Sequence, residues 1–386
     1  MEKFFASCPR GLEALLAEDI AQLGVRDFKA IPGGVHFCAS WPQCYALNLN
    51  SRIASRVLWR VAHASYAKEE DIYRLALNTA WRDWFSAEQT IRVDVTAVHS
   101  PLKSLEFITL RIKDAICDCF RQAQGKRPSV DTREPDMRIQ AFITANECTL
   151  YLDTSGAPLY QRGLRQKTVE APLKENLAAG ILRLIGWQPG QVLFDPMCGS
   201  GTFLLEAAQI AQGRAPGSGR DFAFTRLHNL DAAAWTSLLN EAQARESLPS
   251  ATHQISIFGS DYSPVALRAA LANLDRAGLL PWVKLSVADI LSSDAPAADS
   301  GIMVSNPPYG ERLSEQDELA EFYPLLASTL KTRFAGWHCH FLSADTRLPK
   351  LMRLKPSKRT PLFNGALECR LYGFAMVAGS NRDRAG

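Results

Sequence analysis

The segment Asn306-Pro307-Pro308-Tyr309 places an amide, two prolines and an aromatic ring directly after a predicted strand. Two consecutive prolines remove two backbone donors and fix φ, so the carbonyls of Asn306 and Pro307 can project as acceptors. Asn306 Oδ1 and the Pro307 carbonyl could accept both hydrogens of an exocyclic amine on a flat base, with Tyr309 stacked on the base. Such an amine is a weak nucleophile, because its lone pair is delocalised into the ring. We expect catalysis by positioning this amine against an electrophilic methyl group; the alternative is a proline loop beside a buried tyrosine.

A second segment combines an acid with a glycine-rich turn. An apolar strand ending at Asp195 is followed by a turn that contains Gly199 and Gly201, and a helical pattern opens at Thr202. Glycines let the backbone approach a ligand, a helix N-terminus offers unpaired N–H groups, and the acid can meet a positive group. Leu204 stands where the dinucleotide fingerprint has its third glycine. The segment indicates a nucleotide-like cofactor; the alternative is a glycine turn of a sheet that binds no ligand.

Two further acids close the predicted strands that follow. Asp261 ends one of these strands and Asp289 ends the next. The carboxyl ends of parallel strands share one edge of a sheet, so both acids and Asp195 can face one cofactor. Asp261 suits a vicinal ribose diol, because a carboxylate accepts two parallel hydrogen bonds, and Asp289 suits an adenine amino group. Each of the two could instead be a helix N-cap.

Other chemistries have weaker support. Residues 338–340, His-Cys-His, are flanked by apolar residues, so a buried strand is favoured over a metal site and we expect no metal. A cysteine nucleophile for pyrimidine C5 chemistry would stand beside the base, but Cys198 lies in the cofactor turn. The nine cysteines include no C-x-x-C pair, which favours reduced thiols in the cytoplasm. The sequence contains neither a phosphate-binding G-x-x-x-x-G-K-[ST] motif nor a G-x-S-x-G motif.

Composition is that of a globular protein. The chain has 386 residues, 47% of them apolar and 22% charged, with a net charge of +3, and no apolar run reaches the length of a membrane span. Net charge therefore neither demands nor excludes a nucleic acid. For the basic residues around the helix predicted over 104–124, a solvated helix face is favoured over a phosphate-binding patch. They are Arg111, Lys113, Arg121, Lys126, Arg127, Arg133 and Arg138.

The predicted elements change character along the chain. Strands and helices alternate in α+β fashion over residues 1–65 and 66–157, and residues 158–171 form a connector. From residue 172, apolar strands alternate with helices, which is typical of a parallel α/β sheet covered on both faces. Residues 213–250 resemble an insertion, and Asn364-Gly365 predicts a hairpin that adds an antiparallel pair.

The two chemical motifs and several other segments resemble the THUMP-containing class I S-adenosylmethionine-dependent RNA methyltransferases. Within that group the similarity is to the RlmL type, which methylates guanine N2 in bacterial 23S rRNA. The segments that carry the resemblance are 5–13 (FASCPRGLE), 164–165 (LR), 171–178 (APLKENLA), 195–202 (DPMCGSGT), 306–312 (NPPYGER) and 363–369 (FNGALEC).

The resemblance implies a domain order and a cofactor. We expect a ferredoxin-like domain over residues 1–65, a THUMP domain over 66–157, a linker over 158–171, and a Rossmann-like methyltransferase domain with a seven-stranded, mostly parallel sheet over 172–386. S-adenosylmethionine is the expected cofactor and structured RNA the expected partner. Because the chain ends soon after its last predicted strand, the second methyltransferase fused to some relatives is expected to be absent.

Residue roles carry over by position. Asn306, Pro307, Pro308 and Tyr309 are expected to hold the target base, and residues 172–173 to close over the cofactor. The residues expected to bind the cofactor are Leu173, Asp195, Pro196, Cys198, Gly199, Gly201, Thr202, Asp261, Tyr262, Asp289, Ile290 and Asn306.

The leading hypothesis is a methyl transfer to guanine N2 in 23S rRNA. A tRNA guanine-N2 methyltransferase and a non-catalytic RNA-binding or assembly factor are the alternatives. A DNA adenine methylase shares the motif at 306–309, but no DNA-reading motif is apparent, and a THUMP-like module reads folded RNA by shape.

Overall fold

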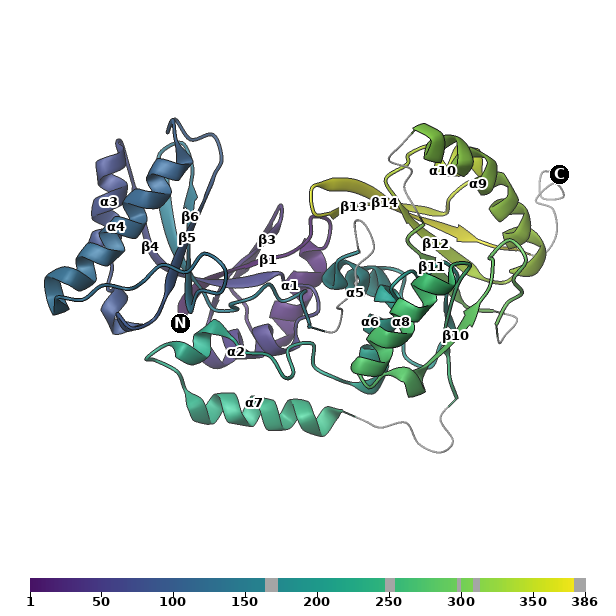
Figure 1. The fold of residues 1–386 in the computed structure, drawn as a ribbon, viewed down its shortest axis with the longest axis horizontal. Helices are drawn as coiled ribbons and strands as arrows, with labels where there is room; N and C mark the ends of the chain where they lie inside the picture. Colours follow the sequence, from purple (N-terminus) through teal and green to yellow (C-terminus); the bar gives the residue numbers. More distant parts are fainter. Residues whose placement is uncertain (164–172, 247–253, 297–299, 308–312, 378–386) are drawn as a thin grey trace. The chain divides into compact units, whose positions relative to one another are not determined.

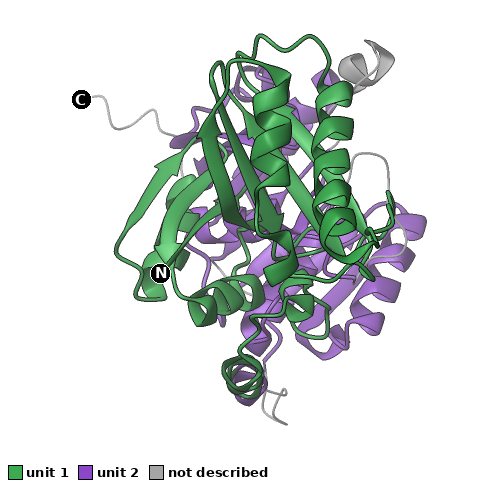
Figure 2. Cartoon of the chain, turned by 90° about the vertical axis from the view of Figure 1, so that its left-hand side faces the viewer, with its two compact units in different colours: residues 1–8, 13–159, 217–241 green, residues 9–12, 160–216, 242–386 purple. Residues whose placement is uncertain are grey.

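The computed structural model describes residues 1–163, 173–246, 254–296, 300–307 and 313–377. The chain forms two compact units (Figure 2). Unit 1 comprises residues 1–8, 13–159 and 217–241, and unit 2 comprises residues 9–12, 160–216 and 242–386. Each unit has its own seven-stranded sheet.

Unit 1 is built on one continuous mixed sheet with the strand order β2-β3-β1-β4-β7-β6-β5 (Figure 1). β4 and β7 pair antiparallel and so join the part before residue 66 to the part after it, while β5 and β6 are parallel. The elements are β1 (Glu2–Ser7), α1 (Glu13–Gln22), β2 (Phe28–Ile31), β3 (Gly34–Ala39), α2 (Trp41–Asn50), β4 (Arg56–Ser65), α3 (Glu69–Leu77), β5 (Ile91–Ala97), α4 (Leu105–Gln124), β6 (Met137–Ile143) and β7 (Glu147–Asp153).

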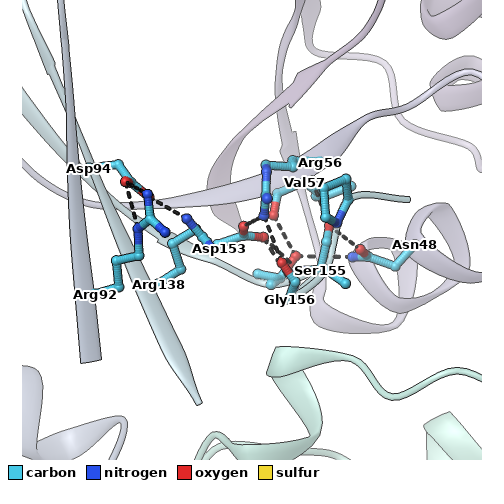
Figure 3. Close-up of polar contacts among 12 residues, drawn as sticks. Asn48, Arg56, Val57, Arg92, Asp94, Arg138, Asp153, Ser155 and Gly156 are labelled. Carbon is cyan, nitrogen blue, oxygen red and sulfur yellow. Dashed lines mark hydrogen bonds and ion pairs between the residues drawn. The ribbon is translucent and has the colours of Figure 1, made fainter. Parts of the chain in front are cut away.

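A polar network fixes the junction of β4 and β7 (Figure 3). Arg56 forms an ion pair with the buried Asp153 and donates to the Gly156 carbonyl at 2.7 Å. Ser155 Oγ donates to Asn48 Oδ1 at 2.6 Å, which connects the end of β7 to α2. Because buried polar groups are costly unless satisfied, these bonds define the chain path where the two halves of the sheet meet.

The basic residues around α4 are largely paired with acids. On the sheet, Asp94 accepts from Arg92 at 2.8 Å and from Arg138 at 2.5 Å (Figure 3). The other ion pairs join Arg111 to Glu70, Lys113 to Asp114, Arg121 to Asp118 and Lys126 to Glu88. This pairing favours the interpretation of the region as a solvated face.

Unit 2 has a sheet with the strand order β10-β9-β8-β11-β12-β14-β13 (Figure 1). The strands from β10 to β12 are parallel, and β14 and β13 add an antiparallel hairpin, as Asn364-Gly365 predicted. The elements are α5 (Glu175–Leu184), β8 (Leu193–Asp195), α6 (Thr202–Gln212), β9 (Ile257–Asp261), α8 (Pro264–Arg276), β10 (Val283–Val287), β11 (Ile302–Ser305), α9 (Leu313–Arg333), β12 (His338–Ser343), α10 (Leu348–Leu351), β13 (Lys358–Asn364) and β14 (Leu367–Ala375).

Helices cover both faces of the unit 2 sheet. On one face, Phe194 and Phe258 pack in a core with Tyr323 of α9 and with Phe334, which directly follows that helix. On the other face, a Cβ built on Gly259 would lie 2.3 Å from Leu204 Cδ1, so glycine allows α6 to approach β9 closely. The predicted α/β fold with a parallel sheet covered on both faces is confirmed.

The predicted insertion has a structural role of its own. Residues 217–241 belong to unit 1 and contain most of α7 (Ala232–Arg245). The Phe224 ring stacks on Tyr45 with ring centroids 4.5 Å apart, and Trp235 meets Phe224 edge-on at 5.0 Å. The segment therefore adds an aromatic layer to unit 1 although it departs from the chain between two elements of unit 2.

Residues 338–340 are part of β12, which confirms the predicted strand. Cys339 is fully buried, and burial lowers the pKa of His340 to about 4. Across the described ranges, no cluster of three potential metal ligands is found. No helix in those ranges is long and apolar enough to cross a membrane.

Candidate active site

The parallel strands of unit 2 bring the predicted acids to one edge of the sheet. β8 ends at Asp195 and β9 at Asp261, and these strands pair in register, Asp195 opposite Gly259. β10 ends beside Asp261, since Val287 is its partner in the register. Asn306 directly follows β11, which lies on the other side of β8. Asp195, Asp261 and Asn306 therefore share this carboxyl edge, and Asp289 lies two residues past the end of β10.

The glycine turn after β8 has the backbone that the sequence predicts. Gly199 and Gly201 have φ values of 54° and 83°, in the region where glycine is favoured, and α6 begins at Thr202. A Cβ on Gly201 would lie 3.2 Å from the Cβ of Ala270, so this glycine also brings α8 close to the turn. The Cys198 N–H donates to the Ser260 carbonyl at 2.9 Å, which fixes the turn against β9.

Asp261 organises the turn from the neighbouring strand. One carboxylate oxygen accepts the Gly199 N–H and the other accepts the Ser263 N–H, each at 2.9 Å. The N-cap of α8 is Ser263, whose Oγ accepts from Ala266, so the alternative role of Asp261 as that cap is wrong. The remaining lone pairs of the carboxylate are compatible with the predicted ribose contact. The next residue, Tyr262, is 76% exposed.

Asp289 and Ile290 lie beyond β10 and differ in exposure. Asp289 is exposed, and its Oδ1 accepts the Leu291 N–H at 2.9 Å in a turn. The Ser293 hydroxyl donates to the Asp289 carbonyl at 2.7 Å, which closes the same turn. The Ile290 side chain is buried in the hydrophobic core of unit 2, so a cofactor contact there would have to use its backbone.

Asp195 is the most unusual group at this edge. Its side chain is 2% exposed, and within the described part of the chain it has no cationic partner. Ser305 Oγ donates to Asp195 Oδ1 at 2.9 Å, and the Met197 N–H approaches the same oxygen at 3.3 Å. Burial, with a smaller effect from the negative charge of Asp261, raises the pKa of Asp195 to about 7 despite these bonds. A buried carboxylate of this kind fits a positively charged ligand group.

Ser305 was not assigned a role from the sequence. Its hydroxyl links β11 to β8, and it immediately precedes Asn306. The bond to Asp195 thus connects the end of β8, which precedes the glycine turn, to the residue before the predicted base-binding motif. The only sequence signal for it is a small polar residue at the end of an apolar strand.

The motif predicted to bind the base, residues 306–309, is described in part. Asn306 is half-buried and Pro307 is buried. Pro308 and Tyr309 lie outside the described residues, so the stacking role of Tyr309 stays a prediction. Residue 172 is also outside them, whereas Leu173 is 4% exposed just ahead of α5.

A buried ion pair behind the glycine turn was also missed. Arg162 donates to both carboxylate oxygens of Glu206 on α6, at 2.6 and 3.2 Å, and both side chains are almost fully buried. Arg162 comes from the segment that the sequence predicts as a connector. That segment therefore helps to hold the helix whose N-terminus borders the turn.

The strand order, the glycine turn after β8 and the acids at the ends of β8 and β9 define a Rossmann-like class I methyltransferase domain. More specifically, the chain belongs to the RMKL-like methyltransferase family, whose methyltransferase-domain model matches residues 162–373. A THUMP domain model matches residues 66–153, and an RlmL ferredoxin-like domain model matches residues 3–58. The predicted resemblance is thus confirmed at the level of these three domains.

Relatives agree with this assignment. The chain is 39% identical over 384 residues to the ribosomal RNA large subunit methyltransferase K/L of Shewanella pealeana. The alignment covers 99% of this chain and 54% of the relative. The chain spans about half the length of the curated relatives it matches.

Solved structures show the same fold over nearly the whole chain. SMU.472, a methyltransferase candidate solved in complex with SAH, matches with a TM-score of 0.87 and 28% identity, covering 98% of this chain and 99% of that one. A possible methylase from Clostridium difficile 630 matches with a TM-score of 0.88 and 25% identity over the same shares.

Proposed function

We propose that this chain is an S-adenosylmethionine-dependent RNA methyltransferase that methylates the exocyclic N2 of a guanine in 23S rRNA. The observation that carries the proposal is the hydrogen bond between Ser305 and Asp195, because it holds the end of β8, next to the glycine turn, against the strand that Asn306 directly follows. The THUMP match and the rRNA methyltransferase names of the relatives support RNA as the substrate.

The cofactor is S-adenosylmethionine. The fold is that of class I methyltransferases, and a close structural neighbour was solved with SAH. The site fits this group because the buried Asp195 lacks a cation among the described residues, and the methionine part of the cofactor carries a positive amino group. Asp261, on the next strand, would accept hydrogen bonds from the ribose.

When bound, the cofactor supplies an electrophilic methyl group on a positively charged sulfur. Asn306 Oδ1 and the Pro307 carbonyl would accept the two hydrogens of guanine N2 and aim its lone pair at the methyl carbon. These acceptors also favour the amine as positive charge develops on its nitrogen. The carboxylate of Asp195 would orient the cofactor, and Ser305 would keep that carboxylate in place.

The test is a methyl transfer assay with labelled S-adenosylmethionine and unmodified 23S rRNA made by transcription, followed by mass spectrometry of the nucleosides. We expect N2-methylguanosine from the wild-type protein. Asn306→Ala should abolish transfer while the circular dichroism spectrum, and hence the fold, is retained. Asn240→Ala, on an exposed position of α7, is the matched control.

Substrate competition completes the test. Transfer to tRNA in preference to rRNA would change the assigned substrate from 23S rRNA to tRNA. Transfer only to duplex DNA would refute the proposal of an RNA methyltransferase. Cofactor titration by calorimetry separates an enzyme from an assembly factor, because no heat of binding would contradict the catalytic proposal.

A further inference from the structure

The hairpin of β13 and β14 extends beyond the carboxyl edge of the unit 2 sheet, where Asp195, Asp261 and Asn306 lie (Figure 1). Ser343, the last residue of β12, pairs with Arg370 of β14, and the hairpin continues to the pair Asn364 and Leu367. Three more residues of β14 therefore lie past the end of β12, or about 10 Å at the rise of a strand. Because β12 is parallel to β11, the turn projects on the side where Asn306 lies.

The segment 9–12 is part of unit 2 and packs on this hairpin. Gly11 has a φ of 95°, and a Cβ built on it would lie 2.5 Å from the Pro361 carbonyl oxygen, so the backbones are in close contact. The guanidinium of Arg10 lies over the Phe363 ring, 4.4 Å from its centroid. A cation–π contact of this geometry holds the exposed guanidinium next to the turn.

Lys174 approaches the same turn from the start of α5. Its ammonium lies 4.9 Å from the centroid of the Tyr160 ring, and 3.6 Å from a Cβ built on Gly365. A short loop side chain at Gly365 would therefore meet the ammonium. Lys174 directly follows Leu173, one of the residues expected to border the cofactor. Two cations thus flank the tip of the hairpin.

Neither cation is neutralised by a carboxylate within the described part of the chain, although most basic residues around α4 are. The acids nearest in sequence are Glu13, whose Oε1 accepts the Gly33 N–H at 2.7 Å, and Glu175, which is buried. Glu368, close to the turn, pairs with Arg370 at 3.6 Å. Aromatic faces fix Arg10 and Lys174 in place but leave their N–H groups and positive charge available to an anion.

We propose that Arg10 and Lys174 bind backbone phosphates of the RNA strand next to the target nucleotide, with the turn at residues 363–365 between them. The inference rests on the proposed function, since it assumes an RNA substrate at the catalytic edge. It extends that function by giving unit 2 its own phosphate contacts with the RNA strand that carries the target base. Phosphate contacts of this kind set the register of a nucleic acid and carry no base specificity.

The experiment compares the full-length double variant Arg10→Gln/Lys174→Gln with a control of equal charge, Lys284→Gln/Lys358→Gln. Both control lysines are exposed on unit 2. Lys284 is the second residue of β10, and Lys358 is the first residue of β13, at the far end of the strand from the hairpin turn. The dissociation constant for a fluorescein-labelled single-stranded RNA of about twelve nucleotides is measured at KCl concentrations from about 50 to about 300 mM, which gives the slope of log K against log salt. Methyl transfer to transcribed 23S rRNA and cofactor affinity are measured in parallel.

Each phosphate contact to a single strand contributes about 0.7 to the slope of log K against log salt, so the double variant should lose about 1.4 and the control close to none. KM for rRNA should rise several-fold with a smaller change in kcat, and cofactor affinity should stay unchanged. The charge-conserving pair Arg10→Lys/Lys174→Arg should retain most of the slope.

An unchanged slope in Arg10→Gln/Lys174→Gln, or an equal loss in the control, would overturn the proposal. A lower melting temperature or a weaker cofactor affinity in Arg10→Gln/Lys174→Gln would also overturn it, because the two cations would then stabilise the fold instead of binding RNA. Failure of the proposed function looks different, because the wild-type protein would then transfer no methyl to rRNA whatever its salt slope.

Discussion

Replacing the buried acid at the end of β8 should make the protein more stable while it destroys cofactor binding. Burial raises the pKa of Asp195 from 3.8 to about 7. The protonated form is thus favoured in the folded state, so stability falls as pH rises from about 4 to about 7 and stays low above that. The difference corresponds to about 4 kcal/mol at alkaline pH.

Asp195→Asn removes the charge and keeps the hydrogen bonds. Asn Oδ1 can accept from Ser305 and from the Met197 N–H, as the carboxylate does. We expect the cofactor-free variant to gain about 2–4 kcal/mol at pH 8, and about 2 kcal/mol less at pH 5, where wild-type Asp195 is already protonated. For a unit of this size that gain raises the melting temperature by at least about 4 °C.

The assay is differential scanning calorimetry of the full chain without cofactor at pH 5 and pH 8, with cofactor titration alongside. Asp261→Asn is the matched control, because both oxygens of Asp261 accept backbone N–H groups and an amide would turn an NH2 toward one of them. That variant should lose about 1–3 kcal/mol. Both variants should lose cofactor affinity. The reasoning is refuted if Asp195→Asn is no more stable than the wild type at pH 8, or gains equally at both pH values.

Three other outcomes follow from the described contacts. Cofactor affinity of the wild type should fall about tenfold per pH unit below pH 7, because Asp195 must then release a proton to meet the positive group; calorimetry in two buffers would detect that proton. Arg162→Gln leaves Glu206 buried without its guanidinium and should cost about 3–5 kcal/mol, measured by urea unfolding at pH 8. Phe224→Ala removes the ring that stacks on Tyr45 and should cost about 3–5 kcal/mol in the calorimetric transition of unit 1, with cofactor affinity unchanged.

The parallel half of the fold was predictable because its strands are continuous apolar runs that each end in a polar residue. Elements without that pattern were missed. α9, for example, contains Pro324 and many polar residues. α7 has a weakly apolar composition, and its environment depends on aromatic residues that lie far away in the sequence, such as Tyr45.

The location of the site was predictable, but its internal bonds were not. Asp195, Asp261 and Asn306 could be placed on one edge because strand ends in a parallel sheet converge there. The bond from Gly199 to Asp261 spans 62 positions and that from Ser305 to Asp195 spans 110, so both depend on which strands are neighbours. Strand order is a property of the assembled sheet, and no local pattern in the sequence encodes it.

The two acids at the ends of β8 and β9 would have different roles in the proposed cofactor site. Asp261 is satisfied by two backbone N–H groups, so it shapes the glycine turn whether or not a ligand is present. Asp195 is buried without a cation among the described residues, so the folded protein bears the cost of its charge until a positive group arrives. Binding of a positive group would relieve that cost, and the relief would contribute to the free energy of cofactor binding. Because Ser305 directly precedes Asn306, the bond that orients the carboxylate also fixes the position at which the predicted base-binding motif begins.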